Sequence, residues 1–368
     1  MIRIFLILLL LLLMPLNSSA DRGDKNQLNF LTWADYIKPE LIKQFEQETG
    51  IKVNVDYVDS HYSLEAKIIA INNEYDVTVP ALAPFFMRQV QFGLFQPLDH
   101  SKLKNYKYID PRVIKIEEHA NNSQNYAVPF MIDTIGIGYD HKKITEIMPD
   151  APINSLKLVF DPEIVKNFAS CGVEMLDSSE EIFALALIYL GIDPNSESEQ
   201  DLKKAAEVLH KIRPFINNIN SALYFNNLGS GDNCLVIGYS GDIVHARQMS
   251  YKSGNNLDIR YVLPKEGSVM TLDLMAIPVG APNKENAYKF IDFIMRPDIN
   301  ASIANFIGFT SPNLASSPLI RKELRDNPNI YPLQHNIDNF YTLRIPTSSF
   351  NRLRNRAWMK FLSDEKEF

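Results

Sequence analysis

The sequence predicts an α/β fold of two domains built around parallel strands. Residues 28–58 have the pattern of strand, helix and strand, and a crossover of this kind joins parallel strands. An apolar leader occupies residues 1–20, and its removal leaves 348 of the 368 residues, enough for two domains with separate cores. A long extended run at 126–139, near the middle of the chain, is a candidate crossover between these domains.

The leader has the pattern of an export signal. It is wholly apolar from Ile4 to Met14, Pro15 ends the run, and small residues up to Ala20 suit cleavage. The apolar run is too short to cross a bilayer. Losing Arg3 with the leader takes the formal net charge from −7 to −8, which argues against nucleic acid as a partner and for a cationic ligand.

The first strand–helix–strand unit is predicted in detail. Leu28 and Phe30 belong to a short buried strand, Pro39 suits a first helical turn, and Gly50 suits a left-handed helix end. Three apolar residues share one face of the helix: Leu41, Ile42 and Phe45. Apolar and polar residues then alternate through 51–57, as in a strand.

The loop after the first strand is the first candidate binding element. Ligands gather at the carboxyl ends of parallel strands, where Trp33, Asp35 and Tyr36 lie. An indole beside a carboxylate suits an organic cation. The alternative is a buried tryptophan and a helix-capping aspartate.

Later elements follow from apolar periodicity and turn residues. The sequence predicts helices near 64–71, 182–190, 202–212 and 287–294, and strands near 76–80, 234–237 and 272–278. Ser178 and Glu181 fit a capping box at the start of one helix. A basic helix around Arg352, Arg354 and Arg356 is predicted to present a solvated face.

The chain has two cysteines, Cys171 and Cys234. An even pair in an exported protein is typical of one disulfide, worth roughly 4 kcal/mol for so long a loop. The alternative is two separate buried thiols.

Enzyme hypotheses find little support in the sequence. Ser240 sits in a near match to a nucleophile elbow, and Asp273 and His335 follow in the order that serine hydrolases use. Asp242 replaces the final glycine of that motif, and no oxyanion loop precedes it, so a secreted serine hydrolase is kept only as a remote alternative. We expect no catalysis, no metal and no cofactor, because the histidines are scattered without ligand spacing.

The remaining candidates are carboxylates at loop–helix junctions: Asp35, Glu181, Asp242 and Asp273. A diamine carries two positive charges on an apolar spacer, and burying it requires a carboxylate near each end. Glu181 and Asp242 could instead cap their own helices.

Six stretches together resemble one family. These are Thr32–Ile37, Glu48–Val53, Cys171–Glu181, Gly238–Asp242, Pro264–Gly267 and Arg296–Asp298. The chain resembles the periplasmic polyamine-binding proteins of putrescine and spermidine ABC importers, and is closer to the putrescine branch.

The resemblance implies a type II periplasmic binding protein fold, with two lobes, hinge crossovers and a ligand cleft between the lobes. One lobe is expected to comprise residues 21–132 and about 262–305, and the other 133–261 and about 306–368. It also implies a periplasmic, monomeric protein that delivers a polyamine to an inner-membrane ABC permease. Another ligand, or a sensor role, is the alternative within the same fold.

The resemblance also implies roles for individual residues. Four correspond to ammonium-binding carboxylates: Asp35, Glu181, Asp242 and Asp273. Trp33 and Tyr36 match cleft aromatics, Ser221 matches a cleft hydroxyl, and Cys171 and Cys234 match a disulfide.

Several cleft positions depart from the family pattern. The departures are Ala81 for serine, Tyr239 for tryptophan, Thr271 for an aromatic residue, Phe309 for tyrosine, and Ile132 for tryptophan beside an unusual Asp133. The four carboxylates of the family pattern are kept, while other residues of the cleft differ. The resemblance therefore predicts recognition of a cation better than it predicts which amine is bound.

Overall fold

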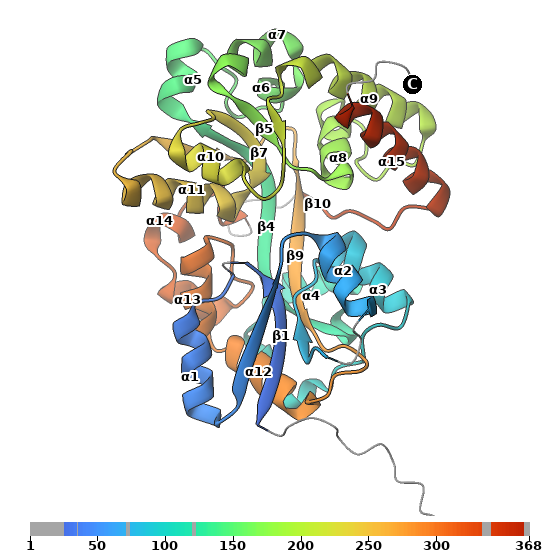
Figure 1. The fold of residues 1–368 in the computed structure, drawn as a ribbon, viewed down its shortest axis with the longest axis vertical. Coiled ribbons are helices and arrows are strands. Elements are labelled where there is room, and N and C mark those ends of the chain that lie inside the picture. The colour runs from blue at the N-terminus through green and yellow to red at the C-terminus, as the bar shows by residue number, and fades with distance from the viewer. Residues whose placement is uncertain (1–25, 35, 71–73, 120–122, 333–339, 364–368) are drawn as a thin grey trace, which may run out of the picture.

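Two lobes stacked along one long axis form the molecule (Figure 1). This computed structural model describes residues 26–34, 36–70, 74–119, 123–332 and 340–363. The predicted leader and its cleavage site near Ala20 therefore lie outside the described residues.

The strands are β1 (Gln27–Trp33), β2 (Lys52–Val58), β3 (Val77–Thr78), β4 (Ala127–Asp140), β5 (Val173–Met175), β6 (Asn218–Ile219), β7 (Leu235–Tyr239), β8 (Ile259–Val262), β9 (Ser268–Ala276) and β10 (Phe340–Tyr341). The α-helices are α1 (Pro39–Thr49), α2 (His61–Ala70), α3 (Met87–Gln91), α4 (Pro111–His119), α5 (His141–Ile147), α6 (Lys157–Phe160), α7 (Pro162–Val165), α8 (Ser179–Tyr189), α9 (Glu199–Ile212), α10 (Tyr224–Ser230), α11 (Ser240–Ser253), α12 (Lys284–Ile294), α13 (Pro297–Ile307), α14 (Lys322–Arg325) and α15 (Ser348–Leu362).

The first strand–helix–strand unit forms as predicted. β1 and β2 are parallel and α1 joins them, with Leu28 opposite Val53. Pro39 begins α1, and Gly50 ends it at φ 70°, where its N–H donates to the carbonyl of Glu46. The predicted apolar face of α1 is buried, so the unit packs its helix against the sheet of the lower lobe.

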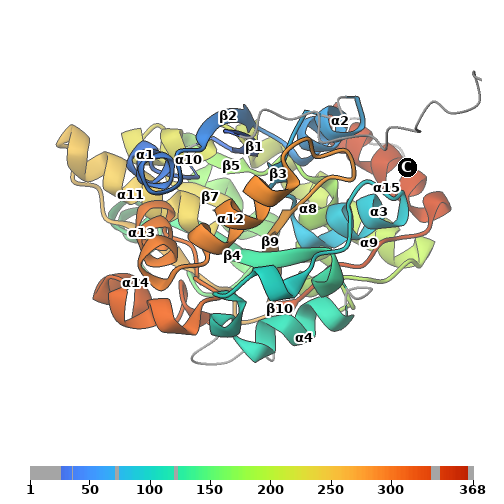
Figure 2. The ribbon, with the colours of Figure 1, turned by 90° about the horizontal axis from the view of Figure 1, so that it is seen from below.

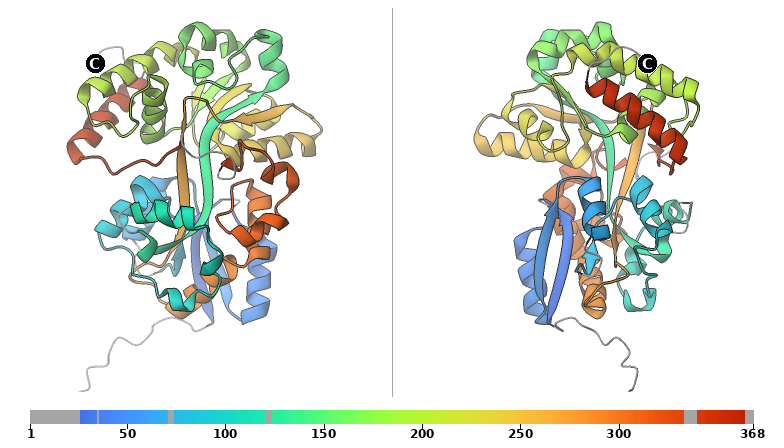
Figure 3. Two further views of the ribbon diagram at one scale, coloured as in Figure 1. Left: turned by 180° about the vertical axis from the view of Figure 1, so that it is seen from behind. Right: turned by 45° about the vertical axis from the view of Figure 1, so that its right-hand side comes forward.

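β4 and β9 connect the two lobes. All 14 residues of β4 are buried. The strand pairs antiparallel with β9 along its first half, and with β7 and β8 along its second half. Figure 3 shows β4 and β9 passing side by side from one lobe into the other. The predicted crossover near the middle of the chain is therefore confirmed.

The strands form one mixed sheet shared by both lobes. Its order is β2-β1-β3-β9-β4-β7-β5-β6, with β10 paired to β9 and β8 to β4. Helices surround the central strands in the view from below (Figure 2). This mixed α/β, two-lobed architecture is the predicted fold class, and the carboxyl ends of its parallel strands point toward the junction of the lobes.

The upper lobe holds a nearly all-buried helix and the disulfide. Helix α8 is buried from Ser179 to Ile188, as its apolar composition predicted. Cys171 and Cys234 form a disulfide with 5.6 Å between their Cα atoms, which confirms the predicted pair.

Two local predictions are wrong. Ser178 precedes α8, but its side chain accepts no capping hydrogen bond, so the predicted capping box is not formed. Arg354 on α15 is buried and pairs with Glu180 at 2.6 Å, whereas Arg352 and Arg356 are exposed as expected.

The exact lobe boundaries stay a prediction. Asn313 donates to the carbonyl of Met295, at the end of α12, at 2.7 Å, and Ser316 donates to that of Pro297, at the start of α13, at 2.9 Å. Helix α15 packs instead beside α8 and α9 in the upper lobe (Figure 1). The predicted boundary near residue 306 therefore stays a prediction.

Candidate functional site

Four carboxyls approach one another at the junction of the lobes. Asp273 lies on β9, Asp133 on β4, Asp242 in the first turn of α11, and Glu181 in the first turn of α8. Coulombic coupling links Asp273 to Glu181, and Asp133 to both Asp242 and Asp273. Three of the four were predicted site residues, and they come from widely separated parts of the chain.

Tyr36 closes one side of this acid cluster. Its buried hydroxyl donates a hydrogen bond to Asp273. Its ring lies 5.5 Å from that of Phe309, edge to face, and 5.8 Å from that of Phe130. The predicted aromatic residues Tyr36 and Phe309 thus form an apolar wall directly beside a carboxyl.

Phe309 is held in place by a glycine of α11. A Cβ added at Gly241 would lie 1.8 Å from the Phe309 ring, so only glycine allows this approach. The same short sequence therefore supplies both Asp242 and the space for an aromatic wall.

Asp242 is positioned by a tyrosine that sequence reasoning missed. The hydroxyl of Tyr224 donates to Asp242 at 2.6 Å and accepts from the backbone N–H of Tyr239 at 3.0 Å. Tyr224 is fully buried on α10, against Gly238. No local pattern marks this role, because the contact exists only once α10 packs on β7.

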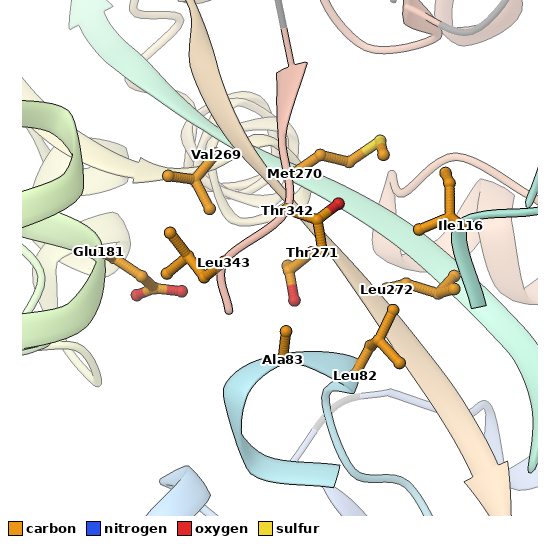
Figure 4. Close-up of a pocket in the computed structure, with 10 residues that line it drawn as sticks. All are labelled: Leu82, Ala83, Ile116, Glu181, Val269, Met270, Thr271, Leu272, Thr342 and Leu343. Atoms are coloured by element: carbon orange, nitrogen blue, oxygen red, sulfur yellow. The ribbon is translucent and has the colours of Figure 1, made fainter. Parts of the chain in front are cut away.

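Glu181 and Tyr239 form a second pair. Tyr239 donates its hydroxyl to Glu181 at 2.8 Å. Figure 4 shows the Glu181 carboxylate pointing into a pocket beside β9. The pocket is lined by Leu82, Ala83, Ile116, Glu181, Val269, Met270, Thr271, Leu272, Thr342 and Leu343. Predicted Thr271 therefore lies in the same pocket as Glu181, across from the turn that contains Ala83 (Figure 4).

Asp133 is the second residue that the sequence analysis did not place in the site. It is 3% exposed, and its Oδ1 accepts hydrogen bonds from the N–H of Thr134 and from the N–H and hydroxyl of Ser240. The available signal was an acid in the middle of a mostly apolar strand, because burying a carboxylate without a partner is costly.

Burial raises the pKa of each acid. It raises the pKa of Asp242 to about 6, against a hydrogen bond from Tyr224 that lowers it. Burial raises the pKa values of Asp273 and Glu181 to about 7, and that of Asp133 well above its usual range. Within the described ranges, none of the four acids forms a salt bridge with a lysine or an arginine. The site therefore gathers four carboxyls whose ionisation is disfavoured by burial and is not helped by an internal counter-ion.

The other predicted residues vary in their placement. Trp33 is half-buried with its ring 4.9 Å from that of His61, and its indole N–H has no partner among the described residues. Ala81 is buried and its backbone bridges to Asp273. Ser221 instead accepts from the backbone N–H of Asp177 at 2.9 Å, outside the acid cluster. Asp35 lies outside the described residues.

The hydrolase alternative has no geometry to support it. Ser240 is 1% exposed and donates to Asp133 at 2.5 Å, and Asp273 accepts from Tyr36. His335 lies outside the described residues. A buried serine that donates to a carboxyl is not presented as a nucleophile.

Comparison with known proteins now decides the family. Residues 40–332 match the family described as bacterial extracellular solute-binding protein. The chain belongs to this family. Its relatives are binding proteins of transport systems rather than enzymes.

Two relatives match this solute-binding protein over nearly its whole length. The putrescine-binding periplasmic protein PotF of Escherichia coli (strain K12) is 38% identical over 353 residues, covering 95% of each chain. The putrescine-binding periplasmic protein SpuD of Pseudomonas aeruginosa (strain UCBPP-PA14) is 38% identical over 345 residues, covering 94% of each chain.

A solved structure agrees with the fold. The spermidine/putrescine ABC transporter substrate-binding protein PotD from Streptococcus pneumoniae superposes with a TM-score of 0.77 at 26% identity, covering 93% of this chain and 100% of that one. The fold is thus the two-lobed fold of solute-binding proteins. In the described part of the chain, each helix is either too short or too polar to span a membrane.

Proposed function

We propose that this solute-binding protein captures a polyamine between its lobes and presents it to an ABC permease of the inner membrane. The observation that supports the proposal is the acid cluster: four carboxyls interact with one another at the junction of the lobes, and none of them is ion-paired within the described residues. Ionised carboxylates buried without a partner are costly, and a ligand with several ammonium groups removes that cost.

The roles proposed for the described residues follow the positions of their side chains. Asp242 and Asp273 pair with ammonium groups, and Glu181 adds a contact shared with Tyr239. Asp35 is proposed to pair with an ammonium group on the family resemblance alone. The walls that pack a methylene spacer are Trp33, Tyr36, Tyr239 and Phe309, and each ring can add about 0.5–2 kcal/mol of cation–π attraction. Ala81 and Thr271 line the crevice without charge, and Ser221 supports it from the second lobe.

The location and assembly belong to the same proposal. The relatives are periplasmic proteins, and the leader at residues 1–20 would take this chain to the periplasm with cleavage near Ala20. We propose a monomer that has no nucleic-acid partner, in keeping with a formal net charge of −7.

A ligand screen tests the proposed function. The mature protein is titrated with putrescine, cadaverine, agmatine and spermidine, and with amino acids and sugars, using thermal shift followed by calorimetry. A ligand at a hundred times its Kd should stabilise the protein by about 2.7 kcal/mol. 1-Aminobutane and 1,4-butanediol are the controls, because they keep the spacer but remove one or both charges. Melting shifts with a sugar or an uncharged amino acid, and none with any polyamine, would overturn the proposal.

A further inference from the structure

Asp133 stands directly beside two of the proposed binding acids. In the β4–β9 pairing, Thr271 lies opposite Asp133 and Asp273 lies opposite Met131. Opposed residues share one face of a sheet, so Asp133 and Asp273 are diagonal neighbours on that face, with Cα atoms about 7–8 Å apart. Asp242 follows two residues after Ser240, whose N–H donates to Asp133 at 3.0 Å.

The two oxygens of Asp133 have different surroundings. Oδ1 accepts three hydrogen bonds, from the N–H of Thr134 at 2.7 Å and from the N–H and hydroxyl of Ser240 at 3.0 and 2.5 Å. In the described part of the chain, no donor is hydrogen-bonded to Oδ2. Oδ1 of Asp133 therefore fixes the start of α11, and Oδ2 is left beside the carboxyls of Asp242 and Asp273. With no donor from the described chain, Oδ2 can accept a hydrogen bond from a ligand.

Because a second carboxyl lies beside Asp242, the end group of the ligand that binds there must supply more than one hydrogen-bond donor. Two adjacent carboxylates repel each other, and one N–H donor cannot satisfy both. A primary ammonium has three donors and a guanidinium has five, so either can bridge two carboxylates. A tertiary ammonium has only one N–H and leaves one carboxylate unpaired.

We infer that Asp133 is a further ligand-binding residue, which together with Asp242 selects a cationic end group bearing at least two N–H donors. The inference rests on the proposed function, because it concerns the same crevice and the same class of ligand. It assigns a specificity role to a residue that otherwise only holds the first turn of α11.

The test variant is Asp133→Asn. Asparagine keeps the size of the side chain, and its amide oxygen can still accept from Thr134 and Ser240 in place of Oδ1. Only Oδ2 is replaced, by an NH2 group. We expect the Kd for putrescine to rise at least about tenfold. We also expect the Tm of the ligand-free protein to rise at a pH high enough to ionise Asp133, because repulsion with Asp242 and Asp273 is removed there.

A second ligand separates recognition from general damage. N,N,N′,N′-Tetramethylputrescine keeps both charges but has one N–H at each end. The wild-type protein should prefer putrescine over this compound strongly, and the preference should shrink at least about fivefold in Asp133→Asn. Agmatine identifies the end group: a larger loss for agmatine than for putrescine places the guanidinium at Asp133, and a smaller loss places the ammonium there.

The matched control is Asp140→Asn. Asp140 is also 3% exposed, lies at the other end of β4, and accepts from the N–H of Lys142 at 3.1 Å. This variant should bind both ligands as the wild type does. If Asp133→Asn fails to fold, Asp133→Ser provides the same measurement.

The outcomes are distinct. If Asp133→Asn has a lower Tm and an unchanged putrescine Kd, then Asp133 only holds α11 and the inference is wrong. If the wild-type protein binds no polyamine at all, the proposed function fails instead. Loss of affinity together with the shrunken preference supports the assignment.

Discussion

Asp242 shows how one residue can be both fixed by the fold and available to a ligand. Its Oδ2 accepts from Tyr224, while burial raises its pKa to about 6. Asp242→Asn keeps an acceptor for Tyr224 but removes the charge. We expect polyamine binding to weaken by about 2 kcal/mol or more, roughly thirtyfold in Kd, because the ammonium loses its buried partner.

Calorimetric titration measures this effect, and Asp258→Asn is its control. Asp258 forms an exposed pair with Arg260 at 2.7 Å, and exposed pairs contribute little. Equal affinities for the two variants would exclude Asp242 from the ligand contacts.

Individual site residues could be predicted only in part. Glu181 and Asp242 were predicted at loop–helix junctions, and each lies in the first turn of a helix. The same prediction is wrong for Asp273, which lies within β9. The partners of these acids were not predicted, because Tyr224 reaches Asp242 only through the packing of α10 on β7. Asp133 was noticed as unusual, but its hydrogen bonds to Ser240 depend on strand pairing between distant segments.

At the scale of elements, α15 depends on one buried ion pair. Arg354 donates to Glu180 on α8 at 2.6 Å, and the side chains are 10% and 6% exposed. Glu180 also accepts from Tyr62 of α2, at 3.4 Å. Arg354→Met would leave Glu180 buried without its cation, and should lower the free energy of unfolding by about 3–5 kcal/mol.

Urea denaturation measures that change, with Arg356→Met as the matched variant. Arg356 is exposed on the same helix, so its substitution should change the free energy of unfolding by less than about 0.5 kcal/mol. Replacing Glu180 by glutamine as well should recover part of the loss. Equal destabilisation by the two single variants would show that the pair contributes nothing specific.

Elements with strong local patterns were predicted well, and those set by tertiary contacts were not. The apolar face and terminal residues of α1 specified that helix, and the long apolar run specified β4. The basic helix was correctly placed at α15, but its arginines look alike in sequence. Only the packing against α8 distinguishes Arg354 from its neighbours.

At the scale of the whole molecule, stability and binding should respond to pH in opposite ways. Burial raises the pKa of Asp242 from 3.8 to about 6, of Asp273 from 3.8 to about 7, and of Glu181 from 4.5 to about 7. Between about pH 4 and 7 the native protein therefore holds more protons than the unfolded chain. The free energy of unfolding of the ligand-free protein should fall as pH rises through this window and level off above it.

One buried histidine has the opposite effect on the pH dependence of the free energy of unfolding. Burial lowers the pKa of His61 to about 4, so this group alone would make stability rise with pH, but three carboxyls outweigh it. Polyamine affinity should rise over the same window, because a bound cation favours the ionised acids. Urea denaturation and calorimetry at about pH 5 and about pH 8 test both trends. Stability of the ligand-free protein that increases with pH would contradict this account.

The sequence also predicted two lobes and a crossover, but it could not determine how the lobes meet. The register of the β4–β9 pairing determines which side chains of each strand face the crevice. This register is established only in the folded sheet, so the sequence did not predict it. The path of the chain after α13 likewise depends on long-range hydrogen bonds of Asn313 and Ser316, which no local sequence pattern marks.

The strands that join the lobes also carry two of the acids, Asp133 and Asp273. At a pH above the raised pKa values of these acids, their ionised forms repel each other and Asp242, and this repulsion favours a wider crevice in the ligand-free protein. A bound cation neutralises this repulsion and allows the lobes to close. The closed conformation then indicates that a cationic ligand is bound. Protonation of the acids also removes their repulsion, but without a ligand. At acidic pH we therefore expect the closed conformation to form in both the ligand-bound and the ligand-free protein.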